Sequence, residues 1–223
     1  MVQKRLTIKN ELNDLYTSLI EKRHQVALNA GFENYRDYAF ASLGRFDYGP
    51  AECFEFHQAV AETVVPLLNE AAAQRKEEMK LDSLRPWDKA VDPLGRGPLK
   101  PFETGEELLT KTIGVFDEMD PFLGNCLKEM VTLDRFDLDS RKGKNPGGYN
   151  YPLEETGYPF IFMNAAGTVR DVVTLLHEGG HAVHSILTKD LALNSFRNFP
   201  SEVAELASMS MELMTMEIGR ASC

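Results

Sequence analysis

The sequence predicts a mainly α-helical protein with one small antiparallel β-ribbon. Apolar residues recur at spacings of three and four along most of the first 130 residues, which is typical of amphipathic helices. One short run near residue 160 is instead rich in aromatic residues and has the length of a strand. Because neither an internal repeat nor a low-complexity tract divides the chain, we interpret residues 1–223 as one mostly helical domain.

The helical pattern extends to about residue 130 and is interrupted once. The interruption, Arg85–Phe102, is too rich in proline and glycine to continue a helix. Pro66 is expected to bend the longest helix, because proline lacks an N–H group and its ring clashes with the preceding turn. Helices are predicted at Leu12–Leu28, Tyr35–Leu43, Ala51–Leu81, Glu106–Met119 and Pro121–Met130.

The sequence changes in character after Asp139, which separates a helical part, residues 1–138, from residues 139–223. The segment SRKGKNPGGYNYPL is predicted to be a loop that runs into a short aromatic strand, and EETG is predicted to be a turn. The apolar run Tyr158–Asn164 is predicted to be a second strand. Together the two strands would form the antiparallel ribbon.

Composition argues against several classes of partner. The chain carries 24 Lys plus Arg against 34 Asp plus Glu, a formal net charge of −10, so neither nucleic acid nor an anionic membrane is an expected partner. No apolar run approaches the roughly 20 residues that a membrane-spanning helix requires. The cysteines Cys53, Cys126 and Cys223 lack a CxxC spacing, which favours a reducing compartment, and we expect a cytoplasmic protein.

A predicted helix from Thr168 to about Leu187 carries an unusual set of residues. Thr168 and Asp171 have the spacing of a capping box, which starts the helix. Most of the circumference is apolar, as in a buried helix, but one polar stripe interrupts it. Its members follow each other at spacings of three or four, so they share a face that is expected to line a cavity: Arg170, Thr174, His177, His181, His184 and Thr188.

The stripe contains an HExxH motif. His177 and His181 are one turn apart, so both imidazoles can reach one zinc ion at roughly 2.0–2.1 Å. Glu178 is close enough to take a proton from a water that the metal acidifies. The alternative is a chance match, because a helix histidine is more often a hydrogen-bonded core residue than a ligand. Gly179 and Gly180 favour the site: each costs a helix interior roughly 1 kcal/mol, so the pair implies a backbone or a substrate close by.

His184 is a weaker candidate. It lies seven residues beyond His177, about 10.5 Å along the helix axis, so it cannot join the other two imidazoles on one ion if the helix is straight. A role in lining the pocket and an ordinary hydrogen-bonded role both stay open.

A third ligand is expected from the following helix, within Phe199–Met214, where Pro200 or Ser201 is a suitable start. Spacing alone does not decide which glutamate binds, and a solvated acidic face is the alternative. A His2Glu set would leave zinc one open position, as catalysis requires. Three glutamates share one face of this helix: Glu202, Glu205 and Glu212.

The sequence resembles the thimet oligopeptidase and oligoendopeptidase F group of zinc metallopeptidases. The resemblance rests on FIFMNAAGT followed by HEGGHAVHS, then on SEVAELASMSMELM, with RKGKNPGGY and LRPWD as weaker matches upstream. It implies a mostly helical, zincin-like fold, one zinc ion per chain and cleavage of short peptides in a deep channel. It also implies that Glu205 is the third ligand and that Glu212 orients a histidine. Glu202 and His184 are then expected beside the ligands and not on the metal.

Members of this family are much longer than 223 residues, so the chain is expected to be a fragment. The resemblance places the tyrosine and histidine groups that stabilise the oxyanion in a further C-terminal region. Two functions from different classes are therefore kept. One is a zinc-dependent metalloendopeptidase that hydrolyses short peptides; the other is an inactive, truncated zinc-binding helical domain that serves as a binding or structural module. Apolar surface exposed by truncation is expected to cause self-association.

Overall fold

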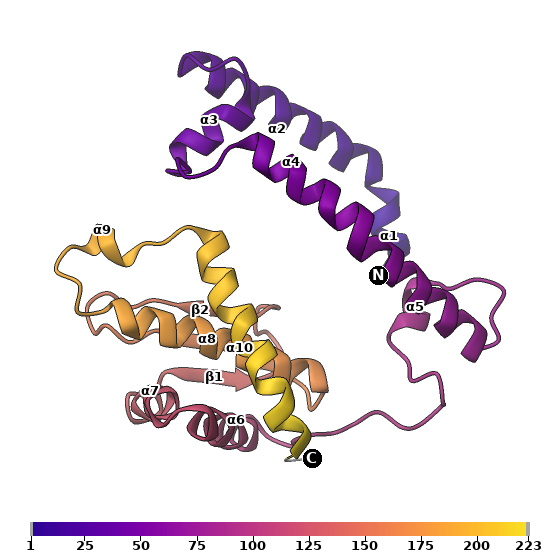
Figure 1. The fold of residues 1–223 in the computed structure, drawn as a ribbon, viewed down its shortest axis with the longest axis vertical. Helices are drawn as coiled ribbons and strands as arrows, with labels where there is room; N and C mark the ends of the chain where they lie inside the picture. The colour runs from indigo at the N-terminus through magenta and orange to yellow at the C-terminus, as the bar shows by residue number, and fades with distance from the viewer. Residues whose placement is uncertain (1, 222–223) are drawn as a thin grey trace. The chain divides into compact units, whose positions relative to one another are not determined.

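The computed structural model describes residues 2–221, and the chain divides into two compact units, Met1–Leu84 and Arg85–Cys223. Helices dominate both units, as predicted (Figure 1). The single domain expected from the sequence stays a prediction. None of the described helices is long and apolar enough to cross a membrane. Cys53 and Cys126 are free thiols, whereas Cys223 lies outside the described residues.

The first unit consists of helices joined by short loops. The segment predicted as one bent helix is helical from Pro50 to Glu78, but it contains a π-helical turn just before Pro66. We attribute the wider turn to the proline, whose ring crowds the preceding turn of a regular α-helix. The helical elements are α1 (Val2–Thr7), α2 (Lys9–Asn29), α3 (Tyr35–Ser42), α4 (Pro50–Ala59), the π turn (Val60–Val64) and α5 (Val65–Glu78).

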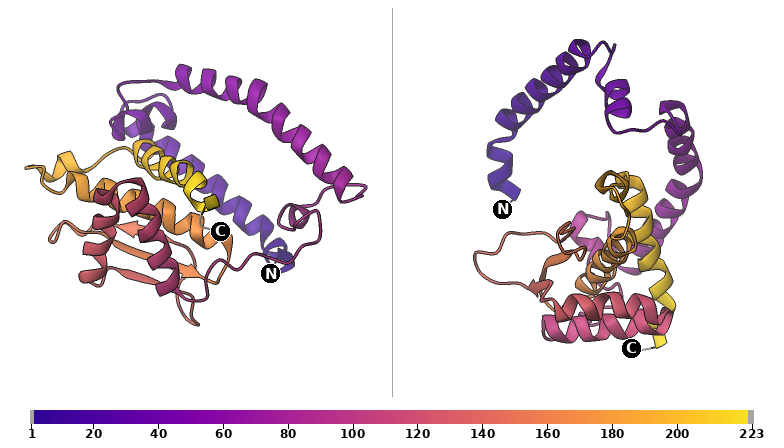
Figure 2. Two further views of the ribbon diagram at one scale, coloured as in Figure 1. Left: turned by 60° about the horizontal axis from the view of Figure 1, so that its bottom comes forward. Right: turned by 90° about the vertical axis from the view of Figure 1, so that its left-hand side faces the viewer.

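The second unit combines helices with a small sheet. Helix α10 crosses α8 (Figure 1), and α6 and α7 run side by side (Figure 2). The predicted helices on either side of Asp120 are confirmed. The elements are a 3₁₀ turn (Pro86–Lys89), α6 (Gly105–Met119), α7 (Pro121–Thr132), β1 (Phe136–Asp139), β2 (Tyr149–Tyr151), β3 (Phe160–Ala165), α8 (Val169–Thr188), α9 (Asn194–Arg197) and α10 (Ser201–Ala221).

The sheet has the strand order β1–β3–β2. The predicted antiparallel ribbon is confirmed as β2 and β3, in which Tyr149 lies opposite Phe162 and the two rings stack at a centroid distance of 5.0 Å. Strand β1 was not predicted, and it pairs with β3 in parallel. A parallel pair requires a long connection between its strands, so no local hairpin signal announces it. As a result β3 is the central strand, and β2 has a free edge.

The core of the second unit lies against one face of β3. Alternate residues of this strand, Ile161, Met163 and Ala165, are buried, as expected for a strand with one covered face. Helix α8 begins with the predicted capping box, in which Thr168 Oγ1 accepts from the N–H of Asp171 and Asp171 accepts from the N–H of Thr168. The same core includes Phe116, Leu127, Met130, Leu175, Ala182 and Ile186.

The loop between β1 and β2 is held by a buried lysine. The Lys144 side chain is 1% exposed, and its ammonium donates to the carbonyl oxygens of Asp137 and Asp139, both at 2.9 Å. Asp137 also accepts from this ammonium and from both terminal nitrogens of Arg141. These bonds, led by those from Arg141, lower the pKa of Asp137 to about 2.

We expect Asp137→Asn to lower the free energy of unfolding by about 1–3 kcal/mol at neutral pH, because a buried ammonium then loses its counter-charge. The pKa of Asp137 is lower in the folded state than in the unfolded state. Its contribution is therefore fully present above about pH 4 and is lost as the pH falls toward 2. Urea unfolding at several pH values measures this. A stability difference between the two proteins that is unchanged at pH 2 would contradict it.

Candidate metal centre

Helix α8 brings the two histidines of the HExxH motif onto one side of the helix. The rings of His177 and His181 lie at a centroid distance of 4.7 Å and are nearly perpendicular, at 88°. Burial lowers the pKa of His181, so its imidazole is held in the neutral form that binds metal ions.

Helix α10 supplies the carboxylate that completes the group. Glu205 Oε2 lies 3.3 Å from His177 Nε2, and Glu205 Oε1 lies 3.8 Å from His181 Nε2. One ligand atom from each of the three residues falls within 4.8 Å of the others. Four ligands arranged tetrahedrally at the usual zinc distances are about 3.4 Å apart. The spacing of these atoms therefore fits a single ion of that kind.

The next glutamate on the same face of α10 contacts one of the histidines. Glu212 Oε1 lies 2.7 Å from His177 Nδ1. Since a carboxylate only accepts hydrogen bonds, Nδ1 carries the proton, and the lone pair of Nε2 is left facing Glu205. A carboxylate behind a histidine in this way is common at metal sites, where it holds the ring in place.

Glu178 lies beside this group but is buried. Its residue is 7% exposed, and it lines a cavity of about 380 Å³ together with His177 and Glu212. Burial is the main cause that raises the pKa of the Glu178 carboxyl, and the charge of Glu205 adds to it. The neighbouring His177 side chain and the backbone N–H of Asn150, on β2, act in the opposite direction. The result is a carboxyl that takes up a proton more readily than an exposed glutamate.

The two remaining candidates lie outside the group. His184 stacks on Phe199 with a centroid distance of 3.8 Å, and its buried Nδ1 has no hydrogen-bond partner among the described residues. Glu202 accepts a hydrogen bond from the hydroxyl of Ser201, next to it on α10. Neither belongs to the set of side chains that could share an ion. Their expected supporting roles stay predictions.

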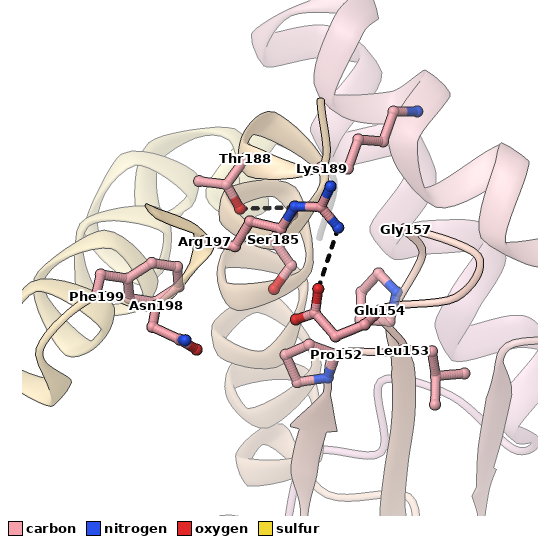
Figure 3. Close-up of a pocket in the computed structure, with 11 residues that line it drawn as sticks. Pro152, Leu153, Glu154, Gly157, Ser185, Thr188, Lys189, Arg197, Asn198 and Phe199 are labelled. Carbon is pink, nitrogen blue, oxygen red and sulfur yellow. Dashed lines mark hydrogen bonds and ion pairs between the residues drawn. The ribbon is translucent and has the colours of Figure 1, made fainter. Parts of the chain in front are cut away.

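A second cavity, of about 170 Å³, lies at the C-terminal end of α8 (Figure 3). Arg197 and Glu154 point toward each other across it, with Arg197 Nη1 3.1 Å from Glu154 Oε2. The same guanidinium also donates twice to the carbonyl of Leu191. These bonds tie the connection between α8 and α10 to the loop after β2. No local sequence pattern predicts this pair, because its two residues lie 43 positions apart in the chain.

The structure explains the adjacent glycines of α8. A Cβ atom on Gly180 would lie 2.8 Å from the Cα atom of Ser208 on α10, and one on Gly179 would lie 2.8 Å from the ring of Phe116 on α6. The expected close backbone is therefore α10. Strand β3 pairs with a strand on each side, so it offers no free edge to an extended peptide.

We predict that Gly180→Ala destabilises the second unit by about 1–3 kcal/mol, because the added methyl group forces α8 and α10 apart. The same displacement should weaken metal binding, since the two helices carry different members of the group. Gly114→Ala in α6 is the matched control, because a Cβ there meets no atom within 4 Å. It should stabilise the helix by about 0.5–1 kcal/mol. Thermal unfolding and metal titration of both variants test this. An equal gain in stability in Gly180→Ala and Gly114→Ala would contradict this prediction.

The sequence of the chain matches a known protein family. The family model for "Peptidase family M3" matches residues 1–221. Oligopeptidase PepF of Bacillus subtilis is 26% identical over 94% of this chain, and an oligoendopeptidase F homolog of Borreliella burgdorferi is 27% identical over 96%. The chain therefore belongs to peptidase family M3.

Solved structures agree with this assignment. The structure of PZ peptidase A with inhibitor 2 matches with a TM-score of 0.86 and 28% sequence identity, over 95% of this chain. The match covers 37% of that chain, and the match to the Bacillus subtilis protein covers 30% of that protein. The present chain thus spans about a third of the length of these relatives.

Proposed function

We propose that this chain carries the zinc-binding and proton-transfer residues of a metalloendopeptidase that hydrolyses short peptides. The observation that carries the proposal is the approach of His177, His181 and Glu205 to one another beside the buried Glu178. Membership of peptidase family M3 supports the reaction type, and the names of the relatives, oligopeptidase and oligoendopeptidase, support short peptides as substrates.

The three donors fit zinc by type as well as by spacing. Two imidazoles and one carboxylate form the His2Glu set that leaves one position open on a four-coordinate ion. When bound there, zinc would polarise the carbonyl of the peptide and make water a better nucleophile. In this proposal Glu212 holds the His177 ring in the required orientation through its 2.7 Å contact with Nδ1.

Glu178 is proposed to move the proton. It accepts a proton from the water that attacks the peptide carbonyl, and it then gives this proton to the nitrogen of the leaving amine. Its raised pKa suits both steps, because a base works best when its pKa is close to the working pH. The backbone N–H of Asn150, on the edge strand β2, donates a hydrogen bond to Glu178. An extended peptide that added to the edge of β2 would therefore pass the Glu178 carboxylate.

Metal binding tests the donor set. His181→Ala should abolish stoichiometric zinc binding, because the two remaining donors cannot hold the ion at comparable affinity. Glu212→Gln removes the charge behind His177 without removing a donor, so zinc affinity should fall only about 10–100-fold. Competition titration with a chromophoric chelator measures both. Unchanged affinity in the His181 variant would exclude the site.

Turnover tests the proton transfer. Glu178→Gln should keep its zinc, since Glu178 is not one of the three donors, but lose a factor of about 10²–10⁴ in the rate of peptide cleavage. The measurement pairs metal analysis with cleavage of quenched fluorescent peptides by the same preparation. Equal cleavage by the variant would reject the assigned role. Stoichiometric zinc with no cleavage by the unmodified chain would favour a binding module.

A further inference from the structure

We propose that Arg170 binds a carboxylate of the peptide, about three to four residues from the bond that is cleaved. The inference rests on the proposed function, because it places a peptide in the cavity beside Glu178. It adds a preference for one class of substrate, peptides that carry a negative charge at that distance. The carboxylate belongs either to an aspartate or glutamate side chain or to the end of the peptide.

Arg170 lies where a peptide held beside Glu178 could reach it. Arg170 lies on the polar stripe of α8 and lines the same cavity of about 380 Å³ as His177 and Glu178. Among the described residues that line this cavity, it is the one lysine or arginine. The other lining residues are Gly148, Val173, Thr174, Met209 and Glu212.

Two acidic residues near Arg170, Asp171 and Glu212, already have other partners. Asp171, the next residue, accepts from the N–H groups of Ala166 and Thr168 and from the Thr168 hydroxyl. Glu212 is bonded to His177. The guanidinium of Arg170 has neither a hydrogen bond nor an ion pair among the side chains that the structure describes, so none of these occupies its donors.

Arg170 contributes little to the stability of the fold. Its side chain is exposed, and it lies in the first turn of α8, where a positive charge is unfavourable. An arginine in this place is thus not explained by packing or by helix stability. A guanidinium pairs well with a carboxylate, because its planar N–H groups match the two oxygens.

The distance follows from the helix. Arg170 precedes His177 by seven residues, which is about 10.5 Å along the axis. An extended peptide advances about 3.3 Å per residue. A peptide that runs along α8 with its reacting bond beside Glu178 therefore brings a group about three to four residues away to Arg170.

The test measures binding, using the zinc-loaded chain with Glu178→Gln so that the peptide is not cleaved. The probes are short fluorescent peptides with blocked ends that carry one aspartate, or one asparagine in its place, about three residues to either side of the centre. A second pair carries no acidic side chain and ends in a free carboxylate or an amide. These two pairs distinguish a side-chain carboxylate from the peptide terminus.

In at least one pair we expect the peptide with the carboxylate to bind about two- to five-fold more tightly than the matching peptide with the amide, as for an exposed ion pair. The difference should disappear in Arg170→Gln, persist in Arg170→Lys, and shrink as salt is added. Lys142→Gln is the matched control, because it removes a positive charge from the same unit at an exposed residue that does not line the cavity. It should keep the full difference.

The outcomes separate the two proposals. Equal affinity for the carboxylate and amide peptides of both pairs would overturn the role of Arg170 and leave the peptidase proposal intact. A preference for the carboxylate peptide that survives in Arg170→Gln would do the same. Failure of every peptide to bind, the neutral ones included, would overturn both, since the inference requires a peptide in the cavity. A preference lost equally in the Lys142 variant would show a general charge effect and would also overturn it.

Discussion

The close approach of α8 and α10 at Gly180 and Ser208 is the contact on which the candidate site depends. With glycine on one helix and a buried serine on the other, the backbones can meet where a larger side chain would separate them. Helix α8 carries both histidines and α10 carries Glu205 and Glu212, so the crossing sets every distance between a histidine and a glutamate of the group. A slip of one turn, about 5.4 Å, would break all of these contacts together. Gly180 and Ser208 therefore influence the positions of the candidate donors, although neither residue belongs to the candidate group.

The same crossing gathers negative charge. Glu178, Glu205 and Glu212 lie around two histidines, and the charge of Glu205 contributes to the raised pKa of Glu178. Like charges at short range disfavour ionisation, so such a cluster is stabilised when a cation binds among its members. Burial acts on two members in a compatible way: it favours the neutral imidazole of His181 and a proton-accepting Glu178. Both effects are compatible with the binding of a cation to this group.

Local sequence patterns were sufficient for part of this description. The capping residues of α8, the spacing of its histidines and the start of α10 follow from periodicity and capping chemistry, which act over a few residues. The choice of Glu205 among three glutamates required the family resemblance, because a helix face does not reveal which neighbour it meets. Strand β1 and the Arg197–Glu154 pair could not be predicted, since each depends on residues far away in the chain. The partner of Gly180 was hidden for the same reason.

The proposed donors and base all lie between Thr168 and Glu212, on two helices of one compact unit. Their assembly therefore depends on the core beneath α8 and on the α8–α10 crossing, both of which are contained in this unit. The cavity beside Glu178 is also lined by exposed groups such as Arg170, which do not belong to this core. Packing constrains the α8–α10 crossing strongly, whereas it constrains Arg170 hardly at all. Under the proposed function, substitutions of such exposed groups would change which peptides bind without disturbing the helices that carry the proposed donors.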